Sequence, residues 1–221
     1  MAERCPPPPP FADLPPLVGG DTLLTEVGQR LVRIYSAGGR HPAHWHTFRG
    51  YGPVGGMRFD HHPPPRRRHP SRSVLYAATS QSPGRGDDPL PTVIAERFGD
   101  SRVIDRTTGA PYLVVWRPNR ALTLLNLSGS DWVVRAGANS ALMAGSRAVA
   151  QRWSRAIWSA YPSMDGLLWA SSPRPAGSSV MLYERARDSV PSAPELNMPL
   201  SHPALEQTLA TIARQLGFSL L

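Results

Sequence analysis

Two arginines lie where a charged side chain needs a partner. Arg33 interrupts the apolar run LVRIYS, and a buried guanidinium is costly unless it is paired. A ligand phosphate would pair it, and so would a structural carboxylate. Arg58 follows Gly55 and Gly56, which let backbone approach a ligand closely. Its planar guanidinium can clamp a pyrophosphate or form a structural ion pair.

Three further side chains can contact a ligand through a ring, a carboxylate or a hydroxyl. Tyr76 in VLYAA can stack on a ring or bond a hydroxyl, or it is an ordinary core tyrosine. Glu96 in IAERF either reaches a ligand or is a solvated residue on a short amphipathic helix. Ser171 in DGLLWASS offers a hydroxyl, with Ser172 beside it. The residue types alone leave these alternatives open.

The elements that position these side chains follow from the apolar pattern. Strands are predicted over 31–36 and 73–79, and a short helix over 92–99 begins at Thr92 and ends at Gly99. The other predicted elements are a helix over 21–30, a strand at Met57–Phe59, a turn-rich connector over 82–91, strands over 112–118, 121–127, 165–172 and 178–186, a helix over 139–161, and a helix from His202 or Pro203 to Leu216 closed by Gly217. We expect one mixed α+β domain over 21–221, after a flexible proline-rich segment at 1–20.

The charge of the chain favours an anionic partner. The 221 residues carry a formal net charge of +8, and all 24 basic residues are arginine. Nucleic acid, an anionic small ligand or an acidic protein fits such a charge, and codon usage alone could also produce it. The arginines are scattered apart from Arg66–Arg68, and aromatic residues are not interleaved with them as on a surface that stacks bases.

The number of cysteines and the lengths of the apolar stretches indicate the cellular compartment. Cys5 is the only cysteine, which excludes an internal disulfide and a cysteine metal cluster. The N-terminus lacks the apolar core of a secretory signal, and no stretch approaches 18 apolar residues. We therefore expect a cytoplasmic protein without a membrane segment.

Two local patterns suggest other sites, and neither has the context it needs. Residues 50–55 match G-x-G-x-x-G, but a dinucleotide-binding turn must follow a buried strand and open a helix. Here HPAHWHTFR precedes the match and GMRFDHHPPP follows it, with prolines that exclude a helix. Six of the seven histidines fall between 41 and 69, yet His61 and His62 precede three prolines and read as an exposed loop. We expect no metal site.

Five motifs remain, and their order along the chain is informative. They are LVRIY with Arg33, GGMRFD with Arg58, VLYAA with Tyr76, IAERF with Glu96 and DGLLWASS with Ser171. In this order they resemble the RES domain family, named for its Arg, Glu and Ser, and residues 31–186 can be laid over the whole family pattern. Asp60 stands where Asn is commoner, and Trp169 where Tyr is commoner.

The resemblance implies an ADP-ribosyltransferase-like α+β fold, with two packed twisted β-sheets, flanking helices and an NAD cleft between the sheets. It implies an enzyme that cleaves the nicotinamide–ribose bond of NAD, as a glycohydrolase, a phosphorylase or an ADP-ribosyltransferase acting on a protein acceptor. NAD would be the substrate. Several family members are toxins of toxin–antitoxin modules, so an Xre-type helix-turn-helix antitoxin is the implied partner.

The resemblance also implies a role for each candidate residue. The implied catalytic residues are Glu96, Arg33 and Tyr76. The implied NAD-binding residues are Arg33, Tyr35, Gly56, Arg58, Tyr76 and Ser171. Two other functions stay open: a basic nucleic-acid-binding protein that uses Arg66–Arg68, and a catalytically inactive RES-like binding protein.

Overall fold

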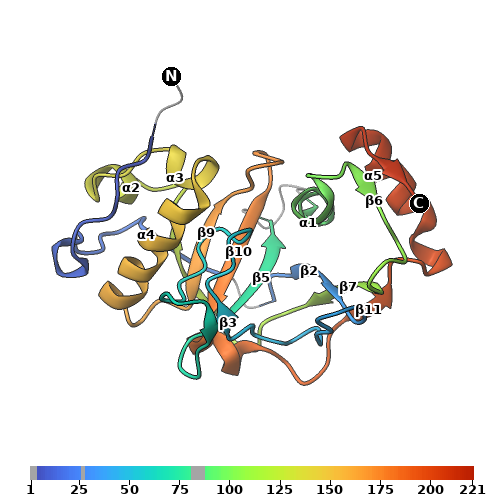
Figure 1. Cartoon of the computed structure of the whole chain (residues 1–221), viewed down its shortest axis with the longest axis horizontal. Coiled ribbons are helices and arrows are strands. Elements are labelled where there is room, and N and C mark those ends of the chain that lie inside the picture. The colour runs from blue at the N-terminus through green and yellow to red at the C-terminus, as the bar shows by residue number, and fades with distance from the viewer. Residues whose placement is uncertain (1–3, 26–27, 81–87) are drawn as a thin grey trace.

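The centre of the molecule is an eight-stranded sheet (Figure 1). The computed structural model describes residues 4–25, 28–80 and 88–221. The strand order is β1-β8-β9-β10-β5-β2-β7-β11, and only β8 and β9 run parallel. The strands of this sheet are β1 (Thr22–Leu24), β2 (Leu31–Ser36), β5 (Val74–Thr79), β7 (Pro111–Trp116), β8 (Thr123–Asn126), β9 (Gly166–Ala170), β10 (Ser178–Tyr183) and β11 (Leu196–Pro199). Two small sheets join β3 (Tyr51–Gly52) to β4 (Arg67–Arg68) and β6 (Val103–Ile104) to β12 (Ser219–Leu220).

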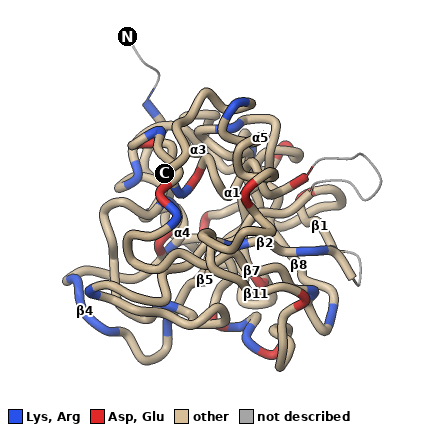
Figure 2. Tube along the Cα trace, turned by 90° about the vertical axis from the view of Figure 1, so that its right-hand side faces the viewer, with Lys and Arg blue, Asp and Glu red and all other residues tan. Residues whose placement is uncertain are grey.

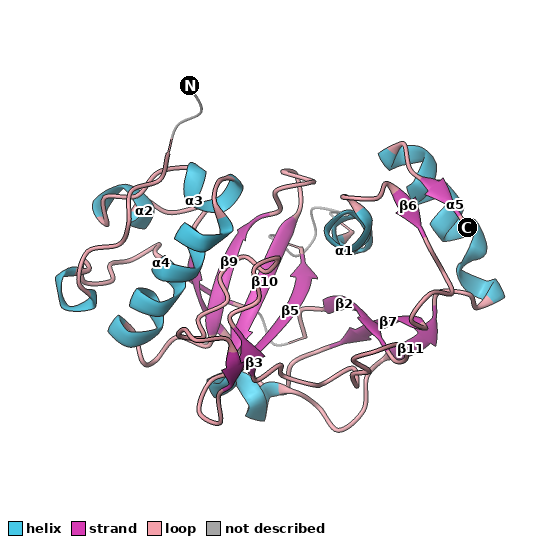
Figure 3. Cartoon of the chain, viewed as in Figure 1, coloured by secondary structure: helices cyan, strands magenta, loops and turns pink. Residues whose placement is uncertain are grey.

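One continuous sheet takes the place of the two sheets expected from the sequence. Only two residue pairs join β5 to β2, whereas six pairs join β2 to β7. Figure 3 shows β9, β10 and β5 rising steeply, while β2, β7 and β11 continue the sheet beside β5 at a shallower angle. The two halves share a core on one face of the sheet, in which Tyr35 and Trp116 of one half lie with Leu75 and Leu182 of the other.

Helices cover the other face of the sheet in two groups. The first group is α2 (Trp132–Arg135), α3 (Ala141–Ala144) and α4 (Arg147–Ala160), which share a core with β5, β9 and β10. The second group is α1 (Pro89–Phe98) and α5 (Glu206–Leu216), which share a core with β2 and β7. Tyr76 belongs to the first core and Ala78 to the second. Because residues two apart in a strand share a face, both groups lie on the same face, and β5 and β10 run between them (Figure 1).

The ends of the helices follow from local chemistry. Asp88 Oδ1 accepts a hydrogen bond from Leu90 N at 2.9 Å, so α1 begins at Pro89, three residues earlier than Thr92, with prolines in its first turn. It ends at Gly99, as predicted. Gly217 ends α5 with φ of 66°, a left-handed conformation that glycine adopts without strain. Short 3-10 helices cover Phe11–Asp13, Glu184–Ser189 and Pro203–Leu205.

The structure confirms the strands expected over 31–36, 73–79, 112–118, 121–127, 165–172 and 178–186, with shorter bounds for most of them. Three other predictions were wrong. The region 21–30 contains strand β1 instead of a helix, and its residues 26–27 lie outside the described part. Met57–Phe59 is turn and coil, and the helix over 139–161 is divided at Gly145. Of the expected connector, residues 82–87 lie outside the described ranges.

The described part of the proline-rich N-terminal segment contacts α4 and the chain that follows it. Trp153 Nε1 donates to the Pro6 carbonyl at 2.8 Å, and the Tyr161 hydroxyl donates to the Pro15 carbonyl at 2.6 Å. Leu14 is buried in the core beneath this helix. Within residues 4–25, 28–80 and 88–221, no helix is both long and apolar enough to cross a membrane.

Candidate functional site

Glu96 on α1 reaches the surface of the sheet at β10. The Ser179 hydroxyl donates to Glu96 Oε1 at 2.8 Å. Ser179 is 4% exposed, whereas Glu96 is exposed to solvent. Its other oxygen, Oε2, has no hydrogen-bond partner in the described part of the chain. One oxygen of the carboxylate is therefore fixed by the protein, and the other is open to a ligand.

Arg58 is held through both its backbone and its side chain. The Tyr76 hydroxyl on β5 donates to the Arg58 carbonyl at 2.8 Å. The Arg58 guanidinium donates from Nη1 to the carbonyl oxygens of Leu142 at 3.3 Å and Gly145 at 3.0 Å, in the segment that enters α4. The backbone and side chain of Arg58 are thus positioned by two different elements.

Two charged side chains, Arg147 and Glu96, lie close enough to Arg58 to influence it. Burial and the like charge of Arg147 lower the pKa of Arg58, while the charge of Glu96 acts in the opposite direction. Arg147 is the first residue of α4 and is exposed, and the N-terminus of a helix favours anions. We refer to Arg58, Tyr76, Glu96, Arg147 and Ser179 as the Glu96 cluster.

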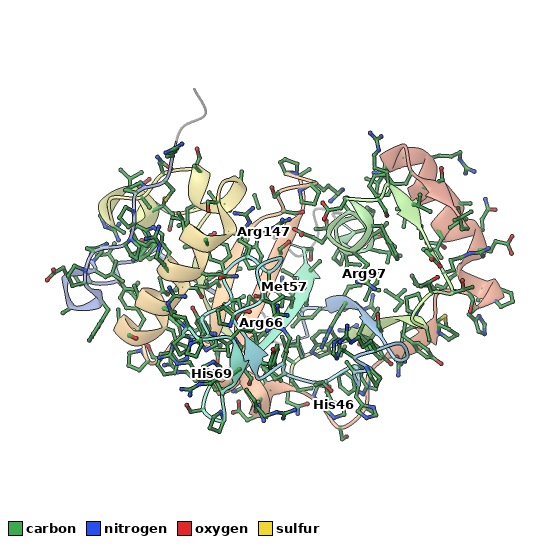
Figure 4. All side chains as sticks on the ribbon, in the orientation of Figure 1. His46, Met57, Arg66, His69, Arg97 and Arg147 are labelled. Atoms are coloured by element: carbon green, nitrogen blue, oxygen red, sulfur yellow. The ribbon has the colours of Figure 1, made fainter. Side chains whose placement is uncertain are left out.

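One face of α4 fixes the loop that carries Arg58. Gln151 Nε2 donates to the carbonyls of Val54 at 2.7 Å and Met57 at 2.8 Å, and Ser154 Oγ donates to the Phe59 carbonyl at 2.7 Å. Positions 147, 151 and 154 have helical i, i+4, i+7 spacing and share this face. Figure 4 shows Arg147 and Met57 between α4 and α1, with Arg97 on the α1 side.

Phe59 takes an unusual backbone conformation beside this loop. Its φ is 59°, in the left-handed region that side chains other than glycine rarely adopt. Its ring is fully buried against Trp169, with centroids 4.8 Å apart. Such backbone strain persists only where the surroundings impose it, and it is common at functional sites. The buried ring is what holds the chain in the shape that presents Arg58.

A buried ion network supports the same loop from its far end. Asp60 is fully buried; its Oδ2 accepts from Arg49 Nη2 at 2.9 Å and from Val54 N at 2.8 Å, and its Oδ1 contacts His62 Nδ1. Burial raises the pKa of Asp60, but the hydrogen bond to His62 and the charge of Arg49 outweigh it and bring the pKa to about 2. Burial is the main cause of the raised pKa of Tyr76, and the charge of Asp60 adds to it.

His61 and His62 are buried, so the expectation of an exposed loop was wrong. His61 Nε2 lies 3.2 Å from Glu184 Oε2, and its ring packs against Trp158 and Tyr183. Burial lowers the pKa of His61 to about 4, although Glu184 acts in the opposite direction. For Glu184, burial raises the pKa, but hydrogen bonds from His61 and Ser73 N outweigh it and bring the pKa to about 2.

This network predicts that the protein loses stability in mild acid. His61 has an ordinary pKa near 6.5 when unfolded and about 4 when folded. The unfolded chain therefore binds the proton first, and stability present above pH 6.5 is lost as the pH falls toward 4. The free energy of unfolding that is lost over this pH range is on the order of 3 kcal/mol. Urea unfolding at pH 7.5 and pH 4.5 measures it. Asp60 and Glu184 add a further loss only between about pH 4.5 and pH 2.

The variant His61→Gln tests the assignment, because its amide can donate to Glu184 but does not titrate. It should be less sensitive to pH between 7.5 and 4.5 than the wild type. His46→Gln is the matched control, since His46 is exposed. An equal pH dependence in His61→Gln and the wild type would contradict the role of His61.

The structure does not bring Arg33 or Tyr35 into the Glu96 cluster. Val32 and Ile34 face α1, so the alternating residues Arg33 and Tyr35 point to the opposite face. Arg33 Nη1 donates to the carbonyls of Trp45 at 3.0 Å and Thr47 at 3.3 Å, and burial lowers its pKa to about 10. The Tyr35 hydroxyl donates to Asn197 Oδ1 at 2.9 Å. Both side chains have partners that stabilise the fold.

Ser171 and Gly56 lie nearer to the cluster than Arg33 and Tyr35 do, but they differ in whether they present a group that a ligand can bind. Ser171 follows β9 on the face that carries Trp169 and Ser179, and its buried Oγ has no hydrogen-bond partner within residues 4–25, 28–80 and 88–221. Such a hydroxyl is available to a ligand. Gly56 is exposed two residues before Arg58, and a Cβ built on it would meet no atom within 4 Å. No protein contact requires a glycine there.

Sequence reasoning missed two members of the cluster. Arg147 is one of many scattered arginines, and only the fold places it beside Arg58. Ser179 lies in a run of two serines that begins the strand β10, and its position opposite Glu96 depends on how α1 packs. The described residues contain no group of three or more His, Cys, Asp or Glu side chains that could hold a metal ion. A hollow of about 390 Å³ between α1 and α5, lined in part by Asp88, Gln207 and Thr211, lies apart from the cluster.

Comparison with known families identifies the class of protein. The family model of the RES domain matches residues 30–201, so the chain belongs to the RES domain family. This range includes every member of the Glu96 cluster and ends before α5.

A solved structure has a similar fold. It is the M. tuberculosis MbcT–MbcA toxin–antitoxin complex, and one of its chains matches with a TM-score of 0.51 and 17% identity, over 85% of this chain and 92% of that one. At this identity the likeness is evidence for the fold alone. The search of curated proteins found no match.

Proposed function

We propose that the protein consumes NAD by cleaving the bond between nicotinamide and ribose. The observation that carries the proposal is the Glu96 carboxylate, which has one oxygen fixed by Ser179 and lies within electrostatic reach of Arg58, on which Arg147 also acts. A dinucleotide with a cationic ribosyl–nicotinamide group and an anionic pyrophosphate matches this pairing of charges. Membership of the RES domain family supports the same substrate.

The proposed reaction follows from the charges in the cluster. As the C–N bond breaks, nicotinamide leaves as a neutral base with the electron pair, and the ribose gains positive charge. The free oxygen of Glu96 stabilises that charge, as carboxylates do in glycosidases. Water, phosphate or a protein side chain then adds to the ribose carbon and releases a proton. With each of the three acceptors, the C–N bond is broken, one new bond to the ribose carbon is formed, and one proton is released.

The other residues of the cluster bind and orient the substrate. Arg58 and Arg147, beside the N-terminus of α4, suit the pyrophosphate. Tyr76 keeps its proton at neutral pH, because burial raises its pKa, and it holds the Arg58 backbone through its hydroxyl. The unpartnered Ser171 hydroxyl suits a ribose or amide group. Arg33 and Tyr35 lie on the other face of the sheet and take no part in this proposal.

The fold we propose is ADP-ribosyltransferase-like, and the position of the cluster on the bent sheet between two groups of helices supports it. The similar chain in the MbcT–MbcA toxin–antitoxin complex supports a toxin that an antitoxin neutralises. We propose an antitoxin with a helix-turn-helix region of the Xre type. Expression of the chain alone should then stop growth, and expression with the antitoxin should restore it.

The experiment that tests the proposed reaction is incubation of the pure protein with NAD. We expect nicotinamide to be released in proportion to enzyme and time, and chromatography of the products will identify ADP-ribose, ADP-ribose 1″-phosphate or a labelled protein. Absence of nicotinamide release, with and without phosphate and cell extract, would contradict the proposal.

The nucleic-acid alternative depends on Arg66–Arg68. Arg67 and Arg68 form β4 of the small β3–β4 sheet, at the margin of the molecule in Figure 2, and Arg66 directly precedes this strand. Charged side chains on an exposed edge strand keep other strands from pairing with it. That role accounts for the arginine run without a nucleic acid.

A further inference from the structure

The alignment of α1 on β10 places Glu96 at one specific strand position. Thr92 and Glu96 are four residues apart, so they share a face of α1 and are about 6 Å apart along its axis. Gly177 directly precedes β10, and its carbonyl accepts a hydrogen bond from Ser171 N at 2.8 Å, which extends the β9–β10 pairing by one residue. Gly177 and Ser179 are two residues apart along this extended backbone, so they share a face and are about 6.7 Å apart. The two spacings nearly match. Thr92 can therefore lie over Gly177 while Glu96 lies over Ser179.

The contacts show that this alignment is realised. A Cβ built on Gly177 would lie 2.9 Å from Thr92 Cβ, and closer still to Thr92 Oγ1. The helix is thus in direct contact with the strand at Gly177, where no side chain intervenes. One step further along, the Ser179 hydroxyl donates to Glu96 Oε1 at 2.8 Å. Gly177 sets the distance between the elements, and Ser179 then reaches the carboxylate.

Ser178 shows how specific this position is. Its side chain points to the opposite face of β10, and its buried Oγ has no hydrogen-bond partner among the residues that the structure describes. Two adjacent serines on the same strand therefore face opposite sides of the sheet, and of the two it is Ser179 that bonds Glu96. The hydroxyl of Ser179 donates to one carboxylate oxygen and leaves Oε2 as the oxygen that can face a ligand.

We infer that Ser179 is a positioning residue for Glu96, and that it determines which carboxylate oxygen faces the substrate. Without this hydrogen bond, the Glu96 side chain is free to rotate at the surface. A freely rotating carboxylate stabilises developing charge less well than one already in place. This inference rests on the proposed function for its effect on the reaction rate, and on the structure alone for the position of the side chain.

The test compares three variants in nicotinamide release. Ser179→Ala should lower kcat by about 10- to 100-fold, the effect of one hydrogen bond to a charged group. Its KM for NAD should stay within about twofold, because Ser179 contacts Glu96 and not the pyrophosphate-binding arginines. Ser179→Thr retains the hydroxyl and should recover most of the rate. Ser178→Ala is the matched control and should keep the wild-type rate.

The possible outcomes distinguish a failure of the inference about Ser179 from a failure of the proposed function. An unchanged kcat in Ser179→Ala, or equal losses in Ser179→Ala and Ser179→Thr, would overturn the role of Ser179 while the function stands. If the wild type releases no nicotinamide, the proposed function fails, and crystal structures of the wild type and Ser179→Ala decide the inference. We expect one Glu96 rotamer on Ser179 in the wild type and several in the variant. The same single Glu96 rotamer in both structures would refute the role of Ser179.

Discussion

Glu96→Gln is expected to release nicotinamide about 1000-fold more slowly than the wild type. The substitution keeps the size of the side chain, and its amide oxygen can still accept from the Ser179 hydroxyl. The side chain at position 96 therefore keeps its position and loses its negative charge. The rate loss therefore measures the electrostatic contribution of the carboxylate to cleavage, with a small change in KM.

A surface carboxylate provides the control for this variant. Glu206 is exposed in the first turn of α5, far along the chain from the cluster, and Glu206→Gln removes the same charge. It should keep the wild-type rate and the wild-type growth arrest. If Glu96→Gln retains more than about a tenth of the activity, the carboxylate is not the group that stabilises the ribose. Unchanged toxicity in Glu96→Gln, without NAD cleavage by either protein, would favour an inactive binding protein.

The strands that carry the predicted site could be read from the sequence because their apolar runs are long. Runs such as VLYAAT and SSVMLY are buried on both faces, and a continuous apolar run then marks a strand. Short strands gave no such signal. Thr22–Leu24 is three residues long and is a strand because it pairs with β8, and such tertiary pairing overrides local preference.

Burial of the histidines could not be read from their neighbours. His61 and His62 precede three prolines, a context typical of solvent-exposed loops. Their partners, however, include Glu184, which lies 123 residues from His61 along the chain. Only the fold brings a carboxylate near enough to accept from a buried imidazole.

The structure brings together some of the residues that the sequence suggested for the site and separates others. The expectation combined Arg33, Arg58 and Glu96, and the structure places Arg58 within electrostatic reach of Glu96. Alternation along β2 separates Arg33 from both, because Leu31, Arg33 and Tyr35 share one face and Val32 and Ile34 share the other. The sequence shows that these two faces exist. It does not show which face α1 covers, since that depends on the crossing of α1 over β2 and β5.

Gly177→Ala is expected to reduce both activity and stability, because α1 must move to accommodate one methyl group. The new Cβ would lie 2.9 Å from Thr92 Cβ and 2.7 Å from Arg174 Nη1. The arginine side chain can move aside, but Thr92 is buried on the helix and can yield only if the backbone shifts. Overpacking of this kind costs about 1–3 kcal/mol. A shift of about 1 Å can lower the rate about 100-fold when it displaces a catalytic group.

A second substitution, Thr92→Gly, tests whether contact with α1 causes the loss of activity in Gly177→Ala. Thr92→Gly removes both atoms of Thr92 that the new methyl group would meet. In the Gly177→Ala background it should raise kcat toward the wild-type value, even though glycine in a helix costs about 1 kcal/mol of stability. Gly19→Ala is the control, since a Cβ there meets nothing within 4 Å. If Gly177→Ala matches Gly19→Ala in nicotinamide release and urea unfolding, close packing at Gly177 does not set the position of Glu96.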